Sequence, residues 1–399
     1  MRPELWKFVA GHPVRRLVYF LALVGLVLAL IAGLLFTVGR RGFGGSETIG
    51  FFRTDVAREV NTPFIVNRDG SHETQLGHDV GVLSPDGSKL LTVSEGNWAR
   101  PAVSNADGSD LNVLEAYPGL EMQLRPIAWS PDGSRILVAT GGPDVTPTGN
   151  GLHTVRSSDG GDLVQLVATP DDDGDSSQGY SADGSRVLFS RIGVGPGIFV
   201  VDADGMGLRQ LSPSNVIPVD LDFWDAISAD WSTDGSKVAF AGFVPPDGSG
   251  QVQLKQNERG ASGLYVVNRD GTGLHTIVSP ELGALSVRWS PRENVIAFTS
   301  GHLGRRHTPA GPELLDAPQV WLVSSDGSNR RRLTEGPGGS TAVTPVWSPD
   351  GRELLFQRKV GDAVTLWIMN SDGSRQRQLT SSVAADYVGG YGWPGLPAR

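Results

Sequence analysis

The sequence contains no cysteine. Disulfide bonds, thiolate metal sites, a cysteine nucleophile and a lipid anchor attached through cysteine are therefore all excluded. A G-x-S-x-G serine motif is also missing, and the nearest segment, 260–264, lacks its spacing. No catalytic residue can be named from such a sequence, and we expect a protein that is not an enzyme.

Basic residues are scarce outside the N-terminal segment. The formal net charge is −9, although six basic residues and one acidic residue give the first 41 positions a charge of +5. The remainder therefore carries −14. Because a strongly acidic surface is repelled by a phosphate backbone, we expect no nucleic-acid partner.

The run from Leu17 to Gly39 has no charged residue. As a helix rising about 1.5 Å per residue it would cross the hydrocarbon core of about 30 Å. The run is longer than the core of a signal peptide, and Arg40 and Arg41 follow it without a convincing cleavage site. We therefore predict a transmembrane signal-anchor over 17–39, with a buried core helix as the alternative.

The basic residues that precede this run outnumber those that follow it. The positive-inside rule then places residues 1–16 in the cytoplasm and the acidic body on the extracytoplasmic side of the cell membrane. Residues 40–46 form a short linker, and residues 395–399 form a tail. The predicted location is a single-pass membrane protein with its folded body outside, in the periplasm or at the cell surface.

The 53 glycines and 26 prolines indicate turn-rich β structure. At Val346–Phe356 an apolar strand ends in Trp-Ser, turns through Pro-Asp-Gly and leaves as a second apolar strand. Serine, proline and glycine at these positions are typical of a tight hairpin turn, in which the aspartate bonds the turn backbone. The same unit recurs, in places degraded, at 83–87, 129–133, 180–184, 231–235 and 289–293.

A second hairpin alternates with the first. It consists of four apolar residues, two polar residues and Asp-Gly, as at Ile198–Gly205 and Leu264–Gly271, with weaker copies turning at Gly70, Gly108 and Gly160. Together the two hairpins supply four strands per unit of about 50 residues, which is typical of a β-propeller blade. We name the strands A to D, where the Trp-Ser strand is A.

The number of blades follows from the unpaired strands at the ends of the array. Seven C–D hairpins stand against six A–B hairpins. A lone B-like strand, 48–53, opens the array and a lone A-like strand, 387–393, closes it. These two halves complete one blade, so we predict an all-β, seven-bladed propeller of four-stranded antiparallel blades over residues 47–394.

The Trp-Ser-Pro-Asp-Gly hairpin, alternating with the Val-Val-Asn-x-Asp-Gly hairpin, resembles the WD40-like propeller repeat of the TolB family. The resemblance covers roughly residues 47–394 and implies the propeller fold. Both tight turns of a blade fall on one face of the ring, and the longer connections fall on the other. Binding residues concentrate on variable loops of rigid scaffolds, so we expect function on that second face.

Two loops of that face carry the candidate binding residues. Acidic side chains surround a tryptophan on one loop, and basic side chains cluster on another that belongs to the next blade. The predicted binding residues are Asp220, Asp222, Trp224, Asp225, Arg305, Arg306 and His307. A packing role for the tryptophan and solvated charges elsewhere are the alternatives.

Neither a metal site nor a cofactor is predicted. Asp171–Asp175 does not match the spacing of a calcium loop, and a solvated acidic loop is expected there. His302 and His307 lack a third ligand. The leading hypothesis is a non-enzymatic scaffold that binds a protein or cell-envelope component, and the alternative is a propeller enzyme of the polysaccharide-lyase or cyclotransferase kind.

Overall fold

The computed structural model of the chain describes most residues from Thr48 onwards. The described ranges are 48–55, 60–75, 82–86, 88–93, 100–105, 109–114, 124–140, 150–169, 175–191, 195–214, 216–218, 229–243, 262–301, 303–308, 311–314, 317–336, 339–361, 363–380 and 386–392. The predicted segments 1–16, 17–39, 40–46 and 395–399 lie outside these ranges. Within the ranges no helix is long and apolar enough to cross a bilayer.

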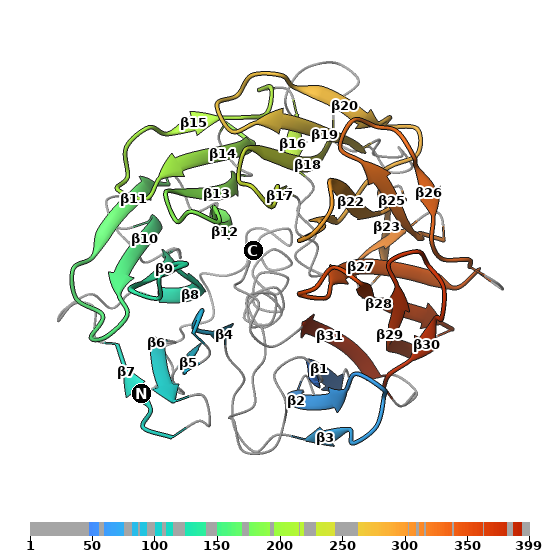
Figure 1. Cartoon of the computed structure of the whole chain (residues 1–399), viewed down its shortest axis with the longest axis horizontal. Coiled ribbons are helices and arrows are strands. Elements are labelled where there is room, and N and C mark those ends of the chain that lie inside the picture. The colour runs from blue at the N-terminus through green and yellow to red at the C-terminus, as the bar shows by residue number, and fades with distance from the viewer. Residues whose placement is uncertain are drawn as a thin grey trace, which may run out of the picture.

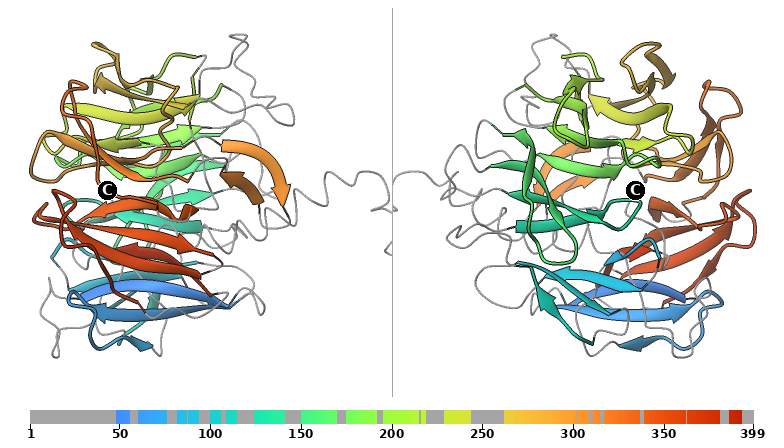
Figure 2. Two further views of the ribbon diagram at one scale, coloured as in Figure 1. Left: turned by 90° about the vertical axis from the view of Figure 1, so that its right-hand side faces the viewer. Right: turned by 60° about the vertical axis from the view of Figure 1, so that its left-hand side comes forward.

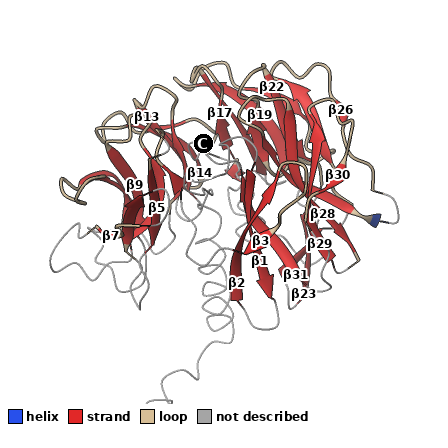
Figure 3. Cartoon of the chain, turned by 60° about the horizontal axis from the view of Figure 1, so that its bottom comes forward, coloured by secondary structure: helices blue, strands red, loops and turns tan. Residues whose placement is uncertain are grey.

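Seven antiparallel sheets surround a central axis (Figure 1), and strands dominate the described chain (Figure 3). Six sheets have four strands, and in the fifth blade two short strands share the innermost position. Each sheet runs from strand A near the axis to strand D at the periphery. The predicted all-β, seven-bladed propeller of antiparallel blades is therefore confirmed as a fold.

The strand bounds follow the blades from the innermost strand outwards. Blades 1 to 4 contain β31 (Asp386–Gly392), β1 (Thr48–Asp55), β2 (Val60–Asn67) and β3 (Thr74–Gln75); β4 (Val82–Leu83), β5 (Lys89–Val93), β6 (Pro101–Asn105) and β7 (Asn112–Val113); β8 (Leu124–Trp129), β9 (Arg135–Thr140), β10 (Gly151–Arg156) and β11 (Val164–Ala168); and β12 (Ser176–Tyr180), β13 (Arg186–Arg191), β14 (Gly197–Asp202) and β15 (Arg209–Gln210).

The remaining three blades complete the ring. They contain β16 (Ile217–Pro218) and β17 (Ala229–Trp231), then β18 (Lys237–Phe243), β19 (Ser262–Asn268) and β20 (His275–Val278); β21 (Val287–Trp289), β22 (Val295–Thr299), β25 (Val320–Ser324) and β26 (Arg331–Arg332); and β27 (Thr341–Trp347), β28 (Glu353–Val360), β29 (Ala363–Asn370) and β30 (Arg377–Gln378). One further hairpin, β23 (Leu303–Thr308) and β24 (Gly311–Leu314), lies between β22 and β25.

Strands from the two ends of the chain close the ring. β31 pairs antiparallel with β1, so that Asp386 lies opposite Asp55 and Gly392 lies opposite Gly50. This is the pairing that the unmatched half-blades predict, with strand bounds shifted by one or two residues. Because the closing blade mixes both ends of the chain, it can form only after the whole array is present.

The core lies between blades. Each blade presents apolar side chains to the preceding blade, as where Phe356 and Met369 of blade 7 pack with Leu322 and Ala297 of blade 6. Equivalent clusters join blades 2 to 7 in succession and join blade 7 to blade 1. Burial on both sides explains why the strands are continuous apolar runs rather than alternating ones.

Candidate functional site on the loop face

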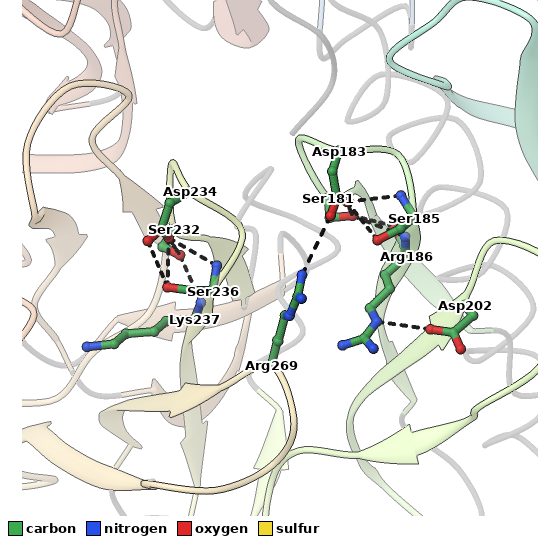
Figure 4. A network of polar contacts seen from close by, with 10 residues as sticks. All are labelled: Ser181, Asp183, Ser185, Arg186, Asp202, Ser232, Asp234, Ser236, Lys237 and Arg269. Carbon is green, nitrogen blue, oxygen red and sulfur yellow. Dashed lines mark hydrogen bonds and ion pairs between the residues drawn. The ribbon is translucent and has the colours of Figure 1, made fainter.

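The tight A–B and C–D turns lie on one face of the ring, which we call the turn face. The A–B turns repeat the same contacts. In blade 3, Ser130 Oγ donates to Asp132 Oδ1 at 2.6 Å and accepts from Arg135 N at 2.9 Å, while Ser134 N donates to the same Asp132 oxygen at 3.0 Å. Figure 4 shows the same arrangement at Ser181–Arg186 and Ser232–Lys237.

These hydrogen bonds fix the charge of the turn aspartates. The side-chain bond from the preceding serine, followed by the backbone and side-chain bonds from the next serine, lowers the pKa of Asp86, Asp183 and Asp234 to about 2. The acids are thus ionised and committed to holding their own turns. Their structural role, expected from the sequence, is confirmed.

The B–C and D–A connections lie on the opposite face, which we call the loop face. One candidate segment, carrying Asp220, Asp222, Trp224 and Asp225, lies outside the described residues. The strands on either side of it, β16 and β17, belong to blade 5 and both pair with β18. The described strands that flank the segment therefore lie at the innermost position of that blade.

The second candidate segment belongs to blade 6. Arg305, Arg306 and His307 lie in β23, which pairs with β24 as a two-stranded sheet. The hairpin projects from the loop face (Figure 2, left). Sequence reasoning predicted a loop here and missed the hairpin, although the glycine and proline residues at 309–312 are a turn signal.

The hairpin has an irregular register at its two arginines. Gly304 lies opposite Glu313, but His307 lies opposite Pro312. Arg305 and Arg306 are therefore extra residues, a bulge in β23. Bulges re-aim side chains and are frequent beside binding sites.

Blades 5 and 6 are direct neighbours, as the strand order predicts. Their sheets share a core that contains Leu264 of β19 and Phe298 of β22. Near the axis, Trp289 N of blade 6 donates to Asp230 Oδ2 of blade 5 at 2.8 Å. The two candidate segments thus start from adjacent blades on one face.

A buried ion pair on the loop face was not anticipated. The Asp175 side chain is fully buried, and Arg191 binds both its oxygens, from Nε to Oδ1 at 2.7 Å and from Nη2 to Oδ2 at 2.8 Å. Thr169 Oγ1 also donates to Asp175 Oδ2 at 2.9 Å. The expectation of a solvated acidic loop is wrong for Asp175, because Arg191 lies too far along the sequence for the pairing to be visible there.

Arg191 also lies over aromatic rings. Its guanidinium carbon is 5.3 Å from the centroid of Phe199 and 5.8 Å from that of Phe189, two rings that stack on each other. Arg358 occupies the equivalent place in blade 7, 4.4 Å from the Trp367 ring. These arginines cover aromatic rings at the loop-face ends of their blades, and we assign them a structural role.

Metal chemistry has no evident centre in the described ranges. Within them, no three His, Asp or Glu side chains gather as metal ligands.

Comparison with known proteins supports the fold and leaves the activity open. No protein-family model matches the chain. An uncharacterized peptidase, YuxL, of Bacillus subtilis (strain 168) is 27% identical over 122 residues, which are 29% of this chain but only 17% of that protein.

Several solved structures are similar to the chain at low sequence identity. A prolyl endopeptidase structure has a TM-score of 0.57 at 13% identity, over 90% of this chain and 52% of that one. An oligogalacturonate lyase in complex with manganese has a TM-score of 0.51 at 16% identity, over 74% of each chain. TolB from Acinetobacter baumannii has a TM-score of 0.48 at 16% identity, over 87% of this chain and 67% of that one.

Proposed function

We propose that the chain is a membrane-anchored, extracytoplasmic propeller that binds a protein or another cell-envelope component through its loop face and catalyses no reaction. The observation that carries the proposal is the structural difference between the two faces. The turn-face acids are committed to their own turns, whereas the loop face carries a projecting hairpin that the ring does not use for pairing.

The centre of the interface is formed by the two candidate segments of blades 5 and 6. Asp220, Asp222, Trp224 and Asp225 supply acids around an aromatic ring, and the β23 bulge supplies arginines. Tryptophan and arginine are enriched among the residues that contribute most to binding. A partner that carries both a basic and an acidic group would complement the pair of segments.

The β23–β24 hairpin is suited to side-chain recognition rather than to strand addition. Pro312 lacks a backbone N–H donor, so β24 pairs poorly with an added strand. The arginine bulge likewise interrupts the hydrogen-bonding edge of β23. A two-stranded hairpin alone is marginally stable in water. Contact with a partner would therefore stabilise the hairpin.

The membrane anchor rests on the uncharged run 17–39. The ring begins at Thr48, which pairs with Asn67 beside a C–D turn, and its last strand ends at Gly392, opposite Gly50. Both ends of the ring are thus on the turn face. An anchor joined there leaves the loop face available to a partner.

Removal of the hairpin tests the binding face. A Cβ placed on Gly301 would lie 3.1 Å from Pro318 Cβ, so the two ends of the insertion are adjacent. Residues 302–317 can therefore be replaced by Gly-Asn, in imitation of the short β28–β29 connection. We expect an unchanged melting temperature and loss of the partner when the full-length protein is pulled down from detergent-solubilised membranes.

Two further variants complete this test. Trp224→Ala combined with Arg306→Ala should also lose the partner, while Arg330→Ala on the turn face should keep it. Retention of the partner by a folded hairpin-deletion variant would contradict the proposal. The anchor is tested separately, since protease added to intact spheroplasts should digest the propeller and spare an N-terminal tag.

An enzyme of the polysaccharide-lyase or cyclotransferase kind is the second candidate. The observation that favours it is the fold shared with an oligogalacturonate lyase in complex with manganese. The test is incubation of the protein with oligogalacturonate, with and without Mn²⁺, followed by ultraviolet detection of unsaturated product. Metal-dependent product formation would replace the scaffold proposal with an enzymatic one.

A further inference from the structure

Four junctions between blades share a clasp at the outer rim of the turn face. In each, the first residue of strand D reaches the C–D turn of the next blade. Arg209 Nη1 donates to the carbonyl oxygen of Asp270 at 2.7 Å, and Arg331 Nη1 donates to that of Asp372 at 2.8 Å. Arg377 reaches the carbonyl of Arg68, one residue earlier in the turn, at the junction that closes the ring.

Histidine replaces arginine at the fourth of these junctions, between blades 5 and 6. His275 Nε2 lies 3.1 Å from the carbonyl oxygen of Ser325 in the next blade, and Nδ1 lies 2.9 Å from that of Gly273 in its own turn. Both partners are carbonyl oxygens, which accept hydrogen bonds and cannot donate them. A neutral imidazole has a single N–H and can satisfy only one of the two, whichever tautomer it adopts.

The protonated ring satisfies both contacts. An imidazolium has two N–H groups and would donate one to each carbonyl, as the guanidinium of Arg331 donates to Asp372 and Ser371 at the next junction. His72, at the rim of blade 1, provides a contrast, since its Nδ1 lies 3.0 Å from the side-chain nitrogen of Asn67. That nitrogen is a donor, so the contact needs an unprotonated Nδ1.

The charges around His275 have mixed signs. On the facing turn, Asp326 is an exposed carboxylate whose pKa is lowered mainly by bonds from Ser328 and also by the charge of His275. Arg330 follows the same turn in the sequence and carries a positive charge. On the turn before β20, Asp270 is held by Thr272 and its carbonyl by Arg209. Each of the two turns that contact the His275 imidazole therefore carries a carboxylate.

We propose that His275 is a proton-dependent clasp between blades 5 and 6. Protonated, it ties the two blades at the rim as arginine does elsewhere; neutral, it must give up one of its two contacts. The inference is independent of the proposed partner binding. It concerns the junction between the two blades from which the candidate binding segments start.

The test compares three full-length proteins by thermal unfolding between pH 8 and pH 5.5. His275→Arg makes the clasp permanent, and His275→Thr removes it, as Thr74 stands at the equivalent place in blade 1. At pH 8 the wild type should melt below His275→Arg, because the neutral ring keeps only one of its two contacts. At pH 5.5 it should approach His275→Arg, a shift of about 1–2 °C for one charge-assisted hydrogen bond.

The sign follows from proton linkage. A folded state that binds a proton more tightly than the unfolded state is stabilised as the pH falls. All other titrating groups are common to the three proteins, so their effects cancel in the comparison. A wild type that keeps a constant offset from both variants across the pH range would overturn the proposal.

Nitrogen NMR of histidine-labelled protein gives a second readout that does not depend on stability. The His275 signals are identified by their absence from the His275→Arg spectrum. At pH 5.5 both ring nitrogens should carry a proton and show hydrogen bonds, Nε2 to Ser325 and Nδ1 to Gly273. The absence of a hydrogen bond at either ring nitrogen of His275 at pH 5.5 would also overturn the proposal.

Discussion

The turn face and the loop face of the ring are built on opposite principles. On the turn face, five blades repeat a serine-to-aspartate hydrogen bond within 2.6–2.7 Å. On the loop face, β28 and β29 are separated by Gly361 and Asp362 alone, whereas the whole β23–β24 hairpin separates β22 from β25. The repeated residues therefore build the ring, and the divergent loops lie on the face to which our proposal assigns partner binding.

The largest expected effect comes from breaking the ring itself. Truncation before Asp386 removes β31, which supplies the innermost strand of blade 1 and pairs with β1. The exposed edge of β1 would be free to pair with other chains. We expect a melting temperature lowered by roughly 10 °C, or aggregation, measured by thermal unfolding and light scattering. Undiminished stability would mean that the ring closes without this strand.

The buried ion pair is the exception to the division between faces, because Asp175 is a loop-face residue with a structural role. Asp175→Ala leaves the Arg191 guanidinium, which is only 11% exposed, without its carboxylate. Removing a partner from such a pair costs about 3 kcal/mol. Denaturant unfolding should show this loss.

An exposed pair supplies the control for the Asp175 variant. Glu335 contacts Arg332, and the two side chains are 75% and 43% exposed. Glu335→Ala should therefore change the free energy of unfolding by less than about 1 kcal/mol. Equal losses for Asp175→Ala and Glu335→Ala would show that burial does not distinguish the two pairs.

The sequence predicted the regular face well and the irregular face poorly. The contacts of a turn are local, so a segment of a few residues with Ser348, Asp350 and Gly351 is enough to predict the hairpin. The count of unmatched strands then predicted the pairing of β1 with β31. By contrast, the Asp175–Arg191 contact joins residues that lie 16 positions apart in the sequence, and no local pattern encodes it. The candidate binding segments are of this second kind, and their mutual contact remains a prediction.

A smaller difference separates blade 3 from other blades of the ring, because blade 3 has His153 at a buried position of strand C. It lies in β10 opposite Val138, and it is buried between blades 2 and 3 with no partner for its Nδ1 among the described residues. Five other blades carry an aromatic ring at this position of strand C: Phe64, Phe199, Tyr265, Trp321 and Trp367. Burial lowers the pKa of His153, so the folded protein keeps the ring neutral.

The sign of the resulting pH effect is opposite to that of the His275 clasp. Stability from a neutral His153 is complete above the ordinary histidine pKa of about 6.5 and is lost as the pH falls below it, because the unfolded chain takes up the proton first. His153→Phe should therefore gain melting temperature over the wild type as the pH falls from 7.5 to 5. A difference that stays constant over this range would show that protonation of His153 plays no part.

The smallest expected effect is a gain on the turn face, at Arg375. This residue has a φ of 54°, in the left-handed region where a Cβ crowds the backbone. Equivalent C–D turns place Gly207, Gly273 or Asn329 there, and asparagine tolerates the conformation through local hydrogen bonds such as those of Asn329 Nδ2 to Ser324 and Ser328. Arg375→Asn should therefore stabilise the protein by about 0.5 kcal/mol in denaturant unfolding.

Arg330→Asn removes the same charge from the neighbouring blade at a residue without positive φ, so it should give no such gain. If both variants raise the free energy of unfolding equally, the cause is the lost charge rather than backbone strain. If only Arg375→Asn raises it, the turn face contains at Arg375 a residue that is less stable there than asparagine.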